Sequence, residues 1–202
     1  MIVKVCGMRE AENIRDIEQC GTDLMGFIFY ERSPRYVDKK VGYLPKDCKR
    51  VGVFVNESSE KIVLRAAEFG LDYIQLHGNE SPEQCQNLTS LGLKVIKAFS
   101  VSSVDDINKA SLYQGFCEHF LFDTACSGYG GSGKSFNWDI LSNYTLETPF
   151  LLSGGISSDS VDALKRFQHP KLLGIDINSC FEISPAMKDA AKVAEFIKQI
   201  KK

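Results

Sequence analysis

Short apolar runs rich in β-branched and aromatic residues recur along the chain and predict β-strands. Several are apolar almost throughout, which is typical of parallel strands covered on their outer face. Segments with the apolar spacing of helices lie between them. The predicted strands span 2–6, 23–29, 49–55, 72–77, 93–99, 117–123, 148–153 and 171–177. The predicted helices span 9–19, 58–69, 81–91, 104–113, 157–167 and 186–201, with weaker segments of one or two turns at 37–45 and 137–144.

Strands that alternate with helical crossovers indicate a parallel sheet, and right-handed crossovers leave two main architectures. One is an open doubly wound sheet, and the other is a closed (β/α)8 barrel. A count of eight strands favours the barrel. No linker, low-complexity tract or block of charge divides the chain. We therefore expect residues 1–202 to form a single domain of the α/β class, a compact (β/α)8 TIM barrel.

Composition and charge exclude several classes of protein. The 202 residues include 24 basic and 26 acidic side chains, a net charge of -2 that argues against a nucleic-acid partner. No stretch approaches the length of apolar sequence that spans a membrane, and the N-terminus turns polar too early for a secretory signal. The 7 cysteines form neither a CxxC pair nor a cluster with zinc spacing. We expect a cytoplasmic protein with reduced thiols, no metal and no cofactor.

Polar side chains stand at the carboxyl ends of several predicted strands, where a barrel builds its active site. Among them, Cys6 and Asp123 are candidates for a base and an acid that face each other across the mouth. For these roles the thiol pKa must fall below its usual ~8.5 and the carboxyl pKa must rise above its usual ~3.9. A buried packing thiol and a loop-anchoring carboxylate are the alternative interpretations, and the residues alone leave both open.

Two glycine-rich segments are candidate phosphate sites. Residues 128–135, GYGGSGKS, formally match the phosphate loop of nucleotide hydrolases, but four residues separate this segment from the end of the predicted strand at Asp123. A milder interpretation is a glycine-rich lid with Lys134 near an anion. The second site combines Gly154 and Gly155, after the seventh strand, with the segment 178–183, where a helix would add its N-terminal dipole. It predicts a phosphorylated small-molecule ligand, unless these glycines serve only tight turns.

Eight segments of the chain, taken in order, carry a resemblance to a known family. They are Val3–Met8, Gly26–Tyr30, Ser33–Val37, Val51–Asn56, Ile74–Glu80, Gly130–Phe136, Ser153–Ile156 and Gly174–Ser179. Each segment alone is a weak signal, whereas the KxCG start, SPRYV, QLHG and GGxGKxF in this order are specific together. With these segments the chain resembles the phosphoribosylanthranilate isomerases of tryptophan biosynthesis, which have a (β/α)8 fold, from residue 3 to about residue 196 without large gaps.

The resemblance implies an Amadori rearrangement, in which N-(5-phosphoribosyl)anthranilate becomes the 1-deoxyribulose 5-phosphate ketose. By similarity, Asp123 matches the general acid that opens the furanose ring, and Cys6 matches the general base that removes the C2 proton. Arg35 matches the residue at the anthranilate carboxylate, whose geometry suits a guanidinium fork. The remaining implied substrate contacts are Asp176 near the ribose hydroxyls and Gly154, Gly155, Asn178 and Ser179 around the phosphate. The implied partner is thus a phosphorylated aminosugar, bound by a monomer or a homodimer.

The chain departs from the family pattern after the eighth strand, where Asn178, Ser179 and Cys180 replace two small hydroxyl residues followed by glycine. This puts the phosphate contacts in doubt. Two alternative functions stay open. One is the related aminoaldose-phosphate isomerase of histidine biosynthesis, which has a carboxylate where this chain has Cys6. The other is a nucleotide hydrolase that uses 128–135 and requires Mg²⁺.

Overall fold

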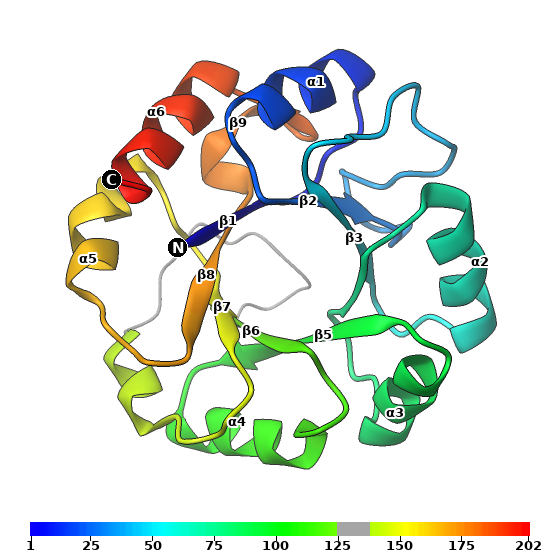
Figure 1. Cartoon of the computed structure of the whole chain (residues 1–202), viewed down its shortest axis with the longest axis vertical. Coiled ribbons are helices and arrows are strands. Elements are labelled where there is room, and N and C mark those ends of the chain that lie inside the picture. The colour runs from blue at the N-terminus through cyan, green and yellow to red at the C-terminus, as the bar shows by residue number, and fades with distance from the viewer. Residues whose placement is uncertain (125–137) are drawn as a thin grey trace.

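A computed structural model describes residues 1–124 and 138–202 of the chain. Eight parallel strands close into a barrel in which each strand pairs with the next and β8 pairs with β1. Figure 1 shows this ring with the helices around its outside, which confirms the predicted (β/α)8 barrel. The strands are β1 (Ile2–Val5), β2 (Leu24–Ile28), β3 (Lys49–Phe54), β4 (Tyr73–Leu76), β5 (Lys94–Val101), β6 (His119–Thr124), β7 (Phe150–Leu152) and β8 (Leu172–Ile177).

Three of the longer helices, α2, α3 and α6, begin after a residue whose side chain binds a free N–H group. The side chains of Ser58, Ser81 and Asp189 each accept a hydrogen bond from a backbone N–H in the first turn of the helix that follows. The helices are α1 (Ala11–Gln19), α2 (Ser59–Phe69), α3 (Pro82–Ser90), α4 (Val104–Asn108), α5 (Val161–Arg166) and α6 (Ala190–Ile200). Single 3-10 segments span Lys109–Tyr113, Trp138–Asn143, Ser158–Ser160 and Ser179–Phe181.

The chain before the last helix differs from the prediction. The sequence pattern predicts a helix over 186–201, but α6 begins at Ala190. A small antiparallel hairpin, β9 (Glu182–Ser184) with β10 (Met187–Lys188), precedes it. Ala186 has a φ of 68°, a left-handed conformation that a right-handed helix excludes. The weak prediction at 37–45 is also wrong, because these residues form no helix.

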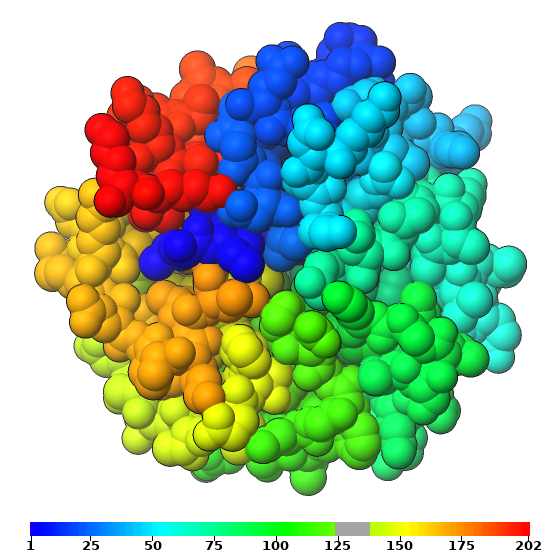
Figure 2. All heavy atoms as spheres, viewed as in Figure 1, coloured from blue at the N-terminus to red at the C-terminus, as the bar shows by residue number. Residues whose placement is uncertain are grey.

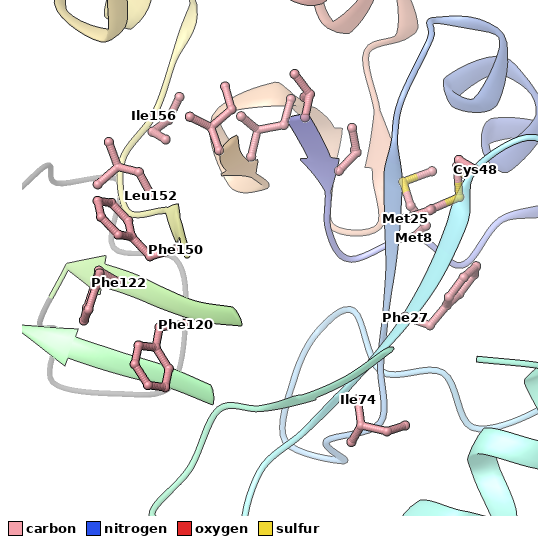
Figure 3. Close-up of a cluster of buried hydrophobic side chains, with 14 of the residues drawn as sticks. Met8, Met25, Phe27, Cys48, Ile74, Phe120, Phe122, Phe150, Leu152 and Ile156 are labelled. Carbon is pink, nitrogen blue, oxygen red and sulfur yellow. The ribbon is translucent and has the colours of Figure 1, made fainter. Parts of the chain in front are cut away.

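The strands separate two apolar layers. Val3 and Val5 of β1 belong to the layer between the barrel and the helices, whereas Lys4 points into the barrel, because side chains alternate along a strand. Figure 3 shows part of the outer layer, where Phe122 and Phe150 from adjacent strands contact edge to face with ring centroids 5.3 Å apart. The inner layer is smaller and consists of Leu24, Val51, Ile96, Ala98, Leu121 and Leu151.

The barrel interior is packed with side chains. In Figure 2, the N-terminal residues (blue) and their neighbours cover the middle of the ring on the face shown, which includes the N-terminus. Ligands therefore have to bind among the loops at the carboxyl ends of the strands, as in other barrels of this type. Within 1–124 and 138–202, none of the helices has the length and apolar character needed to cross a membrane.

Candidate active site

A cavity of about 310 Å³ lies at the carboxyl ends of the strands. Its wall includes residues from the ends of β1, β4, β6 and β8 and from the loops after β2 and β7. The structure thus brings every residue predicted for the site to one place, although the chain separates the first from the last by most of its length. These residues are Cys6, Arg35, Asp123, Gly154, Gly155, Asp176, Asn178 and Ser179.

Cys6 directly follows β1, and its N–H donates to the carbonyl of Ile177 on β8 at 2.9 Å. A Cβ atom on Gly26 would lie 2.7 Å from the Cys6 sulfur, so the glycine provides the room for the thiol. Only 4% of Cys6 is exposed. Burial raises the pKa of the Cys6 thiol, while the cations of Lys4 and Lys188 act to lower it. The net rise is opposite to the predicted decrease, because loss of solvation outweighs the two cations.

Lys4 and Asp176 form a buried ion pair beside Cys6. Their strands are neighbours with these residues in register, and Lys4 Nζ lies 2.7 Å from Asp176 Oδ1. Burial alone would lower the pKa of Lys4, but Asp176 and Cys6 together raise it, so the lysine remains a cation. Ser153 Oγ lies 3.4 Å from the other oxygen of the Asp176 carboxylate. Asp176 is therefore held from two sides at the edge of the cavity.

Asp123 lies at the end of β6, close to His77, which follows β4. His77 Nε2 is 3.5 Å from Asp123 Oδ2, a long contact. Gln75 Nε2 lies 2.8 Å from Nδ1 of the same ring. An amide nitrogen donates a hydrogen bond, so Nδ1 accepts it and Nε2 is the ring nitrogen that faces the carboxylate. The sequence placed His77 at the mouth without a role, and the structure places it against the candidate acid.

The loops after β7 and β8 supply the glycine-rich side of the cavity. Gly154 and Gly155 have φ values of 89° and 66°, which side chains other than glycine rarely adopt. After β8, the segment 178–183 forms a single 3-10 turn (Ser179–Phe181) that leads into β9. The helix expected there is absent from these residues, so no helix dipole is added at this point. An anion on this side would instead contact backbone N–H groups of the two loops.

Arg35 reaches the cavity from the connection between β2 and β3. The turn before it is closed by Ser33, whose Oγ accepts from the Arg35 N–H at 3.2 Å. Its guanidinium makes a forked contact with Glu182: Nε to Oε1 is 2.8 Å and Nη2 to Oε2 is 2.5 Å. Arg35 lines the cavity, but this edge of its guanidinium is occupied by the carboxylate of Glu182, and its assignment to the anthranilate carboxylate stays a prediction.

Glu182 and Lys188, on the hairpin β9–β10, lie behind the cavity wall, where they contact the lining residues Arg35 and Asn178. The sequence analysis missed both. Lys188 Nζ donates to Glu182 Oε1 at 2.6 Å and to Asn178 Oδ1 at 2.7 Å. Burial raises the pKa of Glu182, but the contacts with Arg35 and Lys188 outweigh it and lower the value, so the carboxylate is ionised. Burial lowers the pKa of Lys188, an effect that Glu182 opposes.

The sequence contains only weak indications that Lys4, Glu182 and Lys188 lie beside the cavity. Lys4 could have been found, because it is two positions from Cys6 on one strand and must face the same side. Lys188 could not, because the apolar spacing of 186–201 predicts a helix through it. Glu182 could not, because its partner Arg35 is 147 residues away in the sequence. The glycine-rich segment 128–135, with Lys134, lies outside the described residues.

Comparison with known proteins identifies close relatives of the chain. A family described as N-(5'phosphoribosyl)anthranilate (PRA) isomerase matches residues 3–199. An N-(5'-phosphoribosyl)anthranilate isomerase of Phocaeicola vulgatus is 60% identical over 201 residues, covering 100% of this chain and 98% of the relative.

Solved structures show the same likeness. A structure of monomers generated from the dimeric phosphoribosylanthranilate isomerase of Thermotoga maritima is 31% identical, with a TM-score of 0.81 and coverage of 100% of this chain and 99% of that one. A phosphoribosyl anthranilate isomerase in complex with reduced 1-(o-carboxyphenylamino)-1-deoxyribulose 5-phosphate has the same identity of 31%, TM-score of 0.81 and coverage of 100% and 99%.

Proposed function

Because the chain belongs to the N-(5'-phosphoribosyl)anthranilate isomerase family, we propose that Cys6 and Asp123 carry the proton transfers of its reaction. The chain is an aldose–ketose isomerase of tryptophan biosynthesis. It converts N-(5-phosphoribosyl)anthranilate to 1-(2-carboxyphenylamino)-1-deoxyribulose 5-phosphate. The observation that supports the assignment is that both side chains line one cavity with glycine-rich loops at its edge. Membership of this family excludes the two alternative functions, the aminoaldose-phosphate isomerase of histidine biosynthesis and the nucleotide hydrolase.

In the first step, Asp123 donates a proton to the furanose ring oxygen. The C1–O bond breaks, and the nitrogen lone pair forms a C1=N double bond, which leaves a cationic Schiff base. His77, with its N–H toward Asp123 Oδ2, stabilises the carboxylate that this transfer produces. Proton donation by Asp123 therefore precedes proton removal by Cys6.

In the second step, the Cys6 thiolate removes the C2 proton. The C–H electron pair forms a C1=C2 double bond and the C1=N pair returns to nitrogen, giving an enolamine that tautomerises to the ketone. Burial raises the pKa of Cys6. The cationic Schiff base adds a positive charge next to Lys4 and Lys188, and a nearby cation favours a thiolate. Ring opening thus prepares the base for its step.

The other assignments concern the two ends of the substrate, the anthranilate carboxylate and the phosphorylated sugar. Arg35 binds the anthranilate carboxylate, Asp176 contacts the ribose hydroxyls, and the loops of Gly154–Gly155 and Asn178–Ser179 bind the phosphate. Their support is that all of these residues surround the same cavity. We predict that the chain acts as a monomer or a homodimer and that it is located in the cytoplasm.

The test is a fluorescence assay of phosphoribosylanthranilate consumption by the purified chain in EDTA. We expect Cys6→Ala and Asp123→Asn each to lower kcat by about 100-fold or more, since general acid–base catalysis contributes roughly 10²–10⁴. Cys20→Ala, a partly exposed thiol outside the cavity wall, is the matched control and retains full turnover. Turnover near that of the parent in either variant would remove that residue from the mechanism.

A further inference from the structure

The hairpin β9–β10 carries a charged cluster behind Arg35 that the reaction steps do not use. Arg35, Glu182 and Lys188 are joined by the contacts described above, and the Ala186 N–H adds a further hydrogen bond to Glu182 Oε1 at 3.1 Å. The side chains of Arg35, Glu182 and Lys188 are 14%, 6% and 0% exposed. Charges this deeply buried are costly unless paired, so the geometry of the cluster is strongly constrained.

The cluster holds two cations and one carboxylate, so it is one anion short. Asn178 accepts from Lys188 but carries no charge. Glu182 occupies Nε and one N–H of Nη2 on the guanidinium, which leaves the outer edge, with Nη1, for another acceptor. Arg35 also lines the cavity. The missing anion therefore fits a carboxylate that enters from the cavity.

The end of β1 is shaped to let this cluster approach. Gly7 has a φ of 78°, and a Cβ atom there would lie 2.6 Å from Arg35 Cδ and 2.9 Å from Asn178 Oδ1. Any side chain at Gly7 would push Arg35 or Asn178 away. Glycine at position 7 therefore allows Arg35 and Asn178 to lie close to the backbone next to the candidate base, Cys6.

We propose that Glu182 is a positioning residue that fixes the guanidinium of Arg35 so that its outer edge faces the aromatic carboxylate of the substrate. Lys188 completes the arrangement by joining Glu182 to Asn178 of the phosphate-side loop. One buried network therefore aligns both ends of the substrate. The proposal rests on the assignment of Arg35 to the anthranilate carboxylate made above.

The test measures selectivity for the carboxylate instead of overall activity. Isothermal titration calorimetry gives the affinities of reduced 1-(o-carboxyphenylamino)-1-deoxyribulose 5-phosphate and of the same compound without its carboxylate. We expect the parent to prefer the carboxylated ligand, and Glu182→Gln to reduce this preference by about tenfold, because a charge-assisted contact depends on alignment. Glu195→Gln, an exposed acid on α6, leaves the preference unchanged. A merely structural role would weaken both ligands equally.

Each result separates the two proposals. If Arg35→Met lowers the carboxylate preference and Glu182→Gln does not, the positioning role is wrong and the assignment of Arg35 stands. If Arg35→Met leaves the preference unchanged, the assignment of Arg35 itself fails. Should Glu182→Gln not fold, Glu182→Asp carries the same measurement, since it keeps the charge that Lys188 needs and withdraws the carboxylate from Arg35 by one methylene.

Discussion

Two buried lysine–glutamate clusters stand at different places around the barrel and differ in their charge balance. Lys97 Nζ lies 3.2 Å from Glu80 Oε2 and within 2.8–3.2 Å of the carbonyls of Leu76, Gly78 and Ala98. Glu80 in turn accepts from the N–H groups of Asn56 and Gly78. This cluster contains one cation and one anion, and backbone groups form the other hydrogen bonds of both side chains.

The cluster of Arg35, Glu182 and Lys188 is open by contrast. It has an extra cation, and one of its members lines the cavity, whereas neither Lys97 nor Glu80 does. The balanced cluster is complete within the protein, whereas the unbalanced one has a cation left over. Under the proposal above, this cation is the charge that a ligand carboxylate meets.

The largest expected difference concerns stability. Lys97→Met leaves Glu80 as an unpaired buried charge and should lower the free energy of unfolding by about 3–5 kcal/mol. Lys188→Met should lower it by less than half as much, because Glu182 keeps Arg35 as a partner. Urea denaturation followed by circular dichroism measures both values. Equal losses for the two variants would show that charge balance does not separate the clusters. Lys49→Met, in an exposed pair, is the control, with a loss of at most about 1 kcal/mol.

A smaller effect is expected from Arg35→Lys in the open cluster. Lysine keeps the charge but cannot contact Glu182 and a substrate carboxylate with one planar group. KM should rise roughly tenfold while kcat stays within about threefold, because the lost contact is the same in the ground state and the transition state. Steady-state assays in EDTA give both constants. A decrease in kcat alone would place Arg35 at the reacting atoms and would contradict its assignment to the carboxylate.

The smallest effect concerns the pH dependence of Cys6. Because burial raises its pKa, the thiol is protonated at neutral pH, and its thiolate forms as the pH rises through the elevated value. Labelling by iodoacetamide, followed by mass spectrometry of the peptide, should therefore be slower at Cys6 than at Cys180 at pH 7. Lys188→Met removes a cation that lowers the pKa of Cys6. In this variant, the pH dependence of Cys6 labelling should therefore shift to higher pH. Faster labelling of Cys6 than of Cys180 in the parent at pH 7 would contradict the raised pKa.

Much of the fold follows from patterns that are local in the sequence. Apolar runs of strand length between amphipathic segments predicted the eight strands, because parallel strands covered by helices have this composition. The same reasoning placed Cys6, Asp123 and Asp176 at one end of the barrel, since strand ends converge there. Resemblance added Arg35, whose position after a turn says little by itself.

The parts that could not be predicted depend on distant contacts. Arg35 and Glu182 are 147 residues apart, so no local pattern relates them. The left-handed φ of Ala186, which delays the start of the expected helix to Ala190, occurs at a residue other than glycine, so the sequence does not indicate it. The direction of the Cys6 pKa depends on a balance between burial and two lysines that only the folded arrangement determines.

The distance along the chain between Arg35 and Glu182 has a consequence for biosynthesis. At about 5–20 residues per second, a ribosome adds the carboxylate roughly 7–30 s after the guanidinium. During that interval a nascent chain carries Arg35 but not yet the hairpin with Glu182. The forked contact can therefore form only late in translation, so the guanidinium remains without this partner until most of the chain has been made.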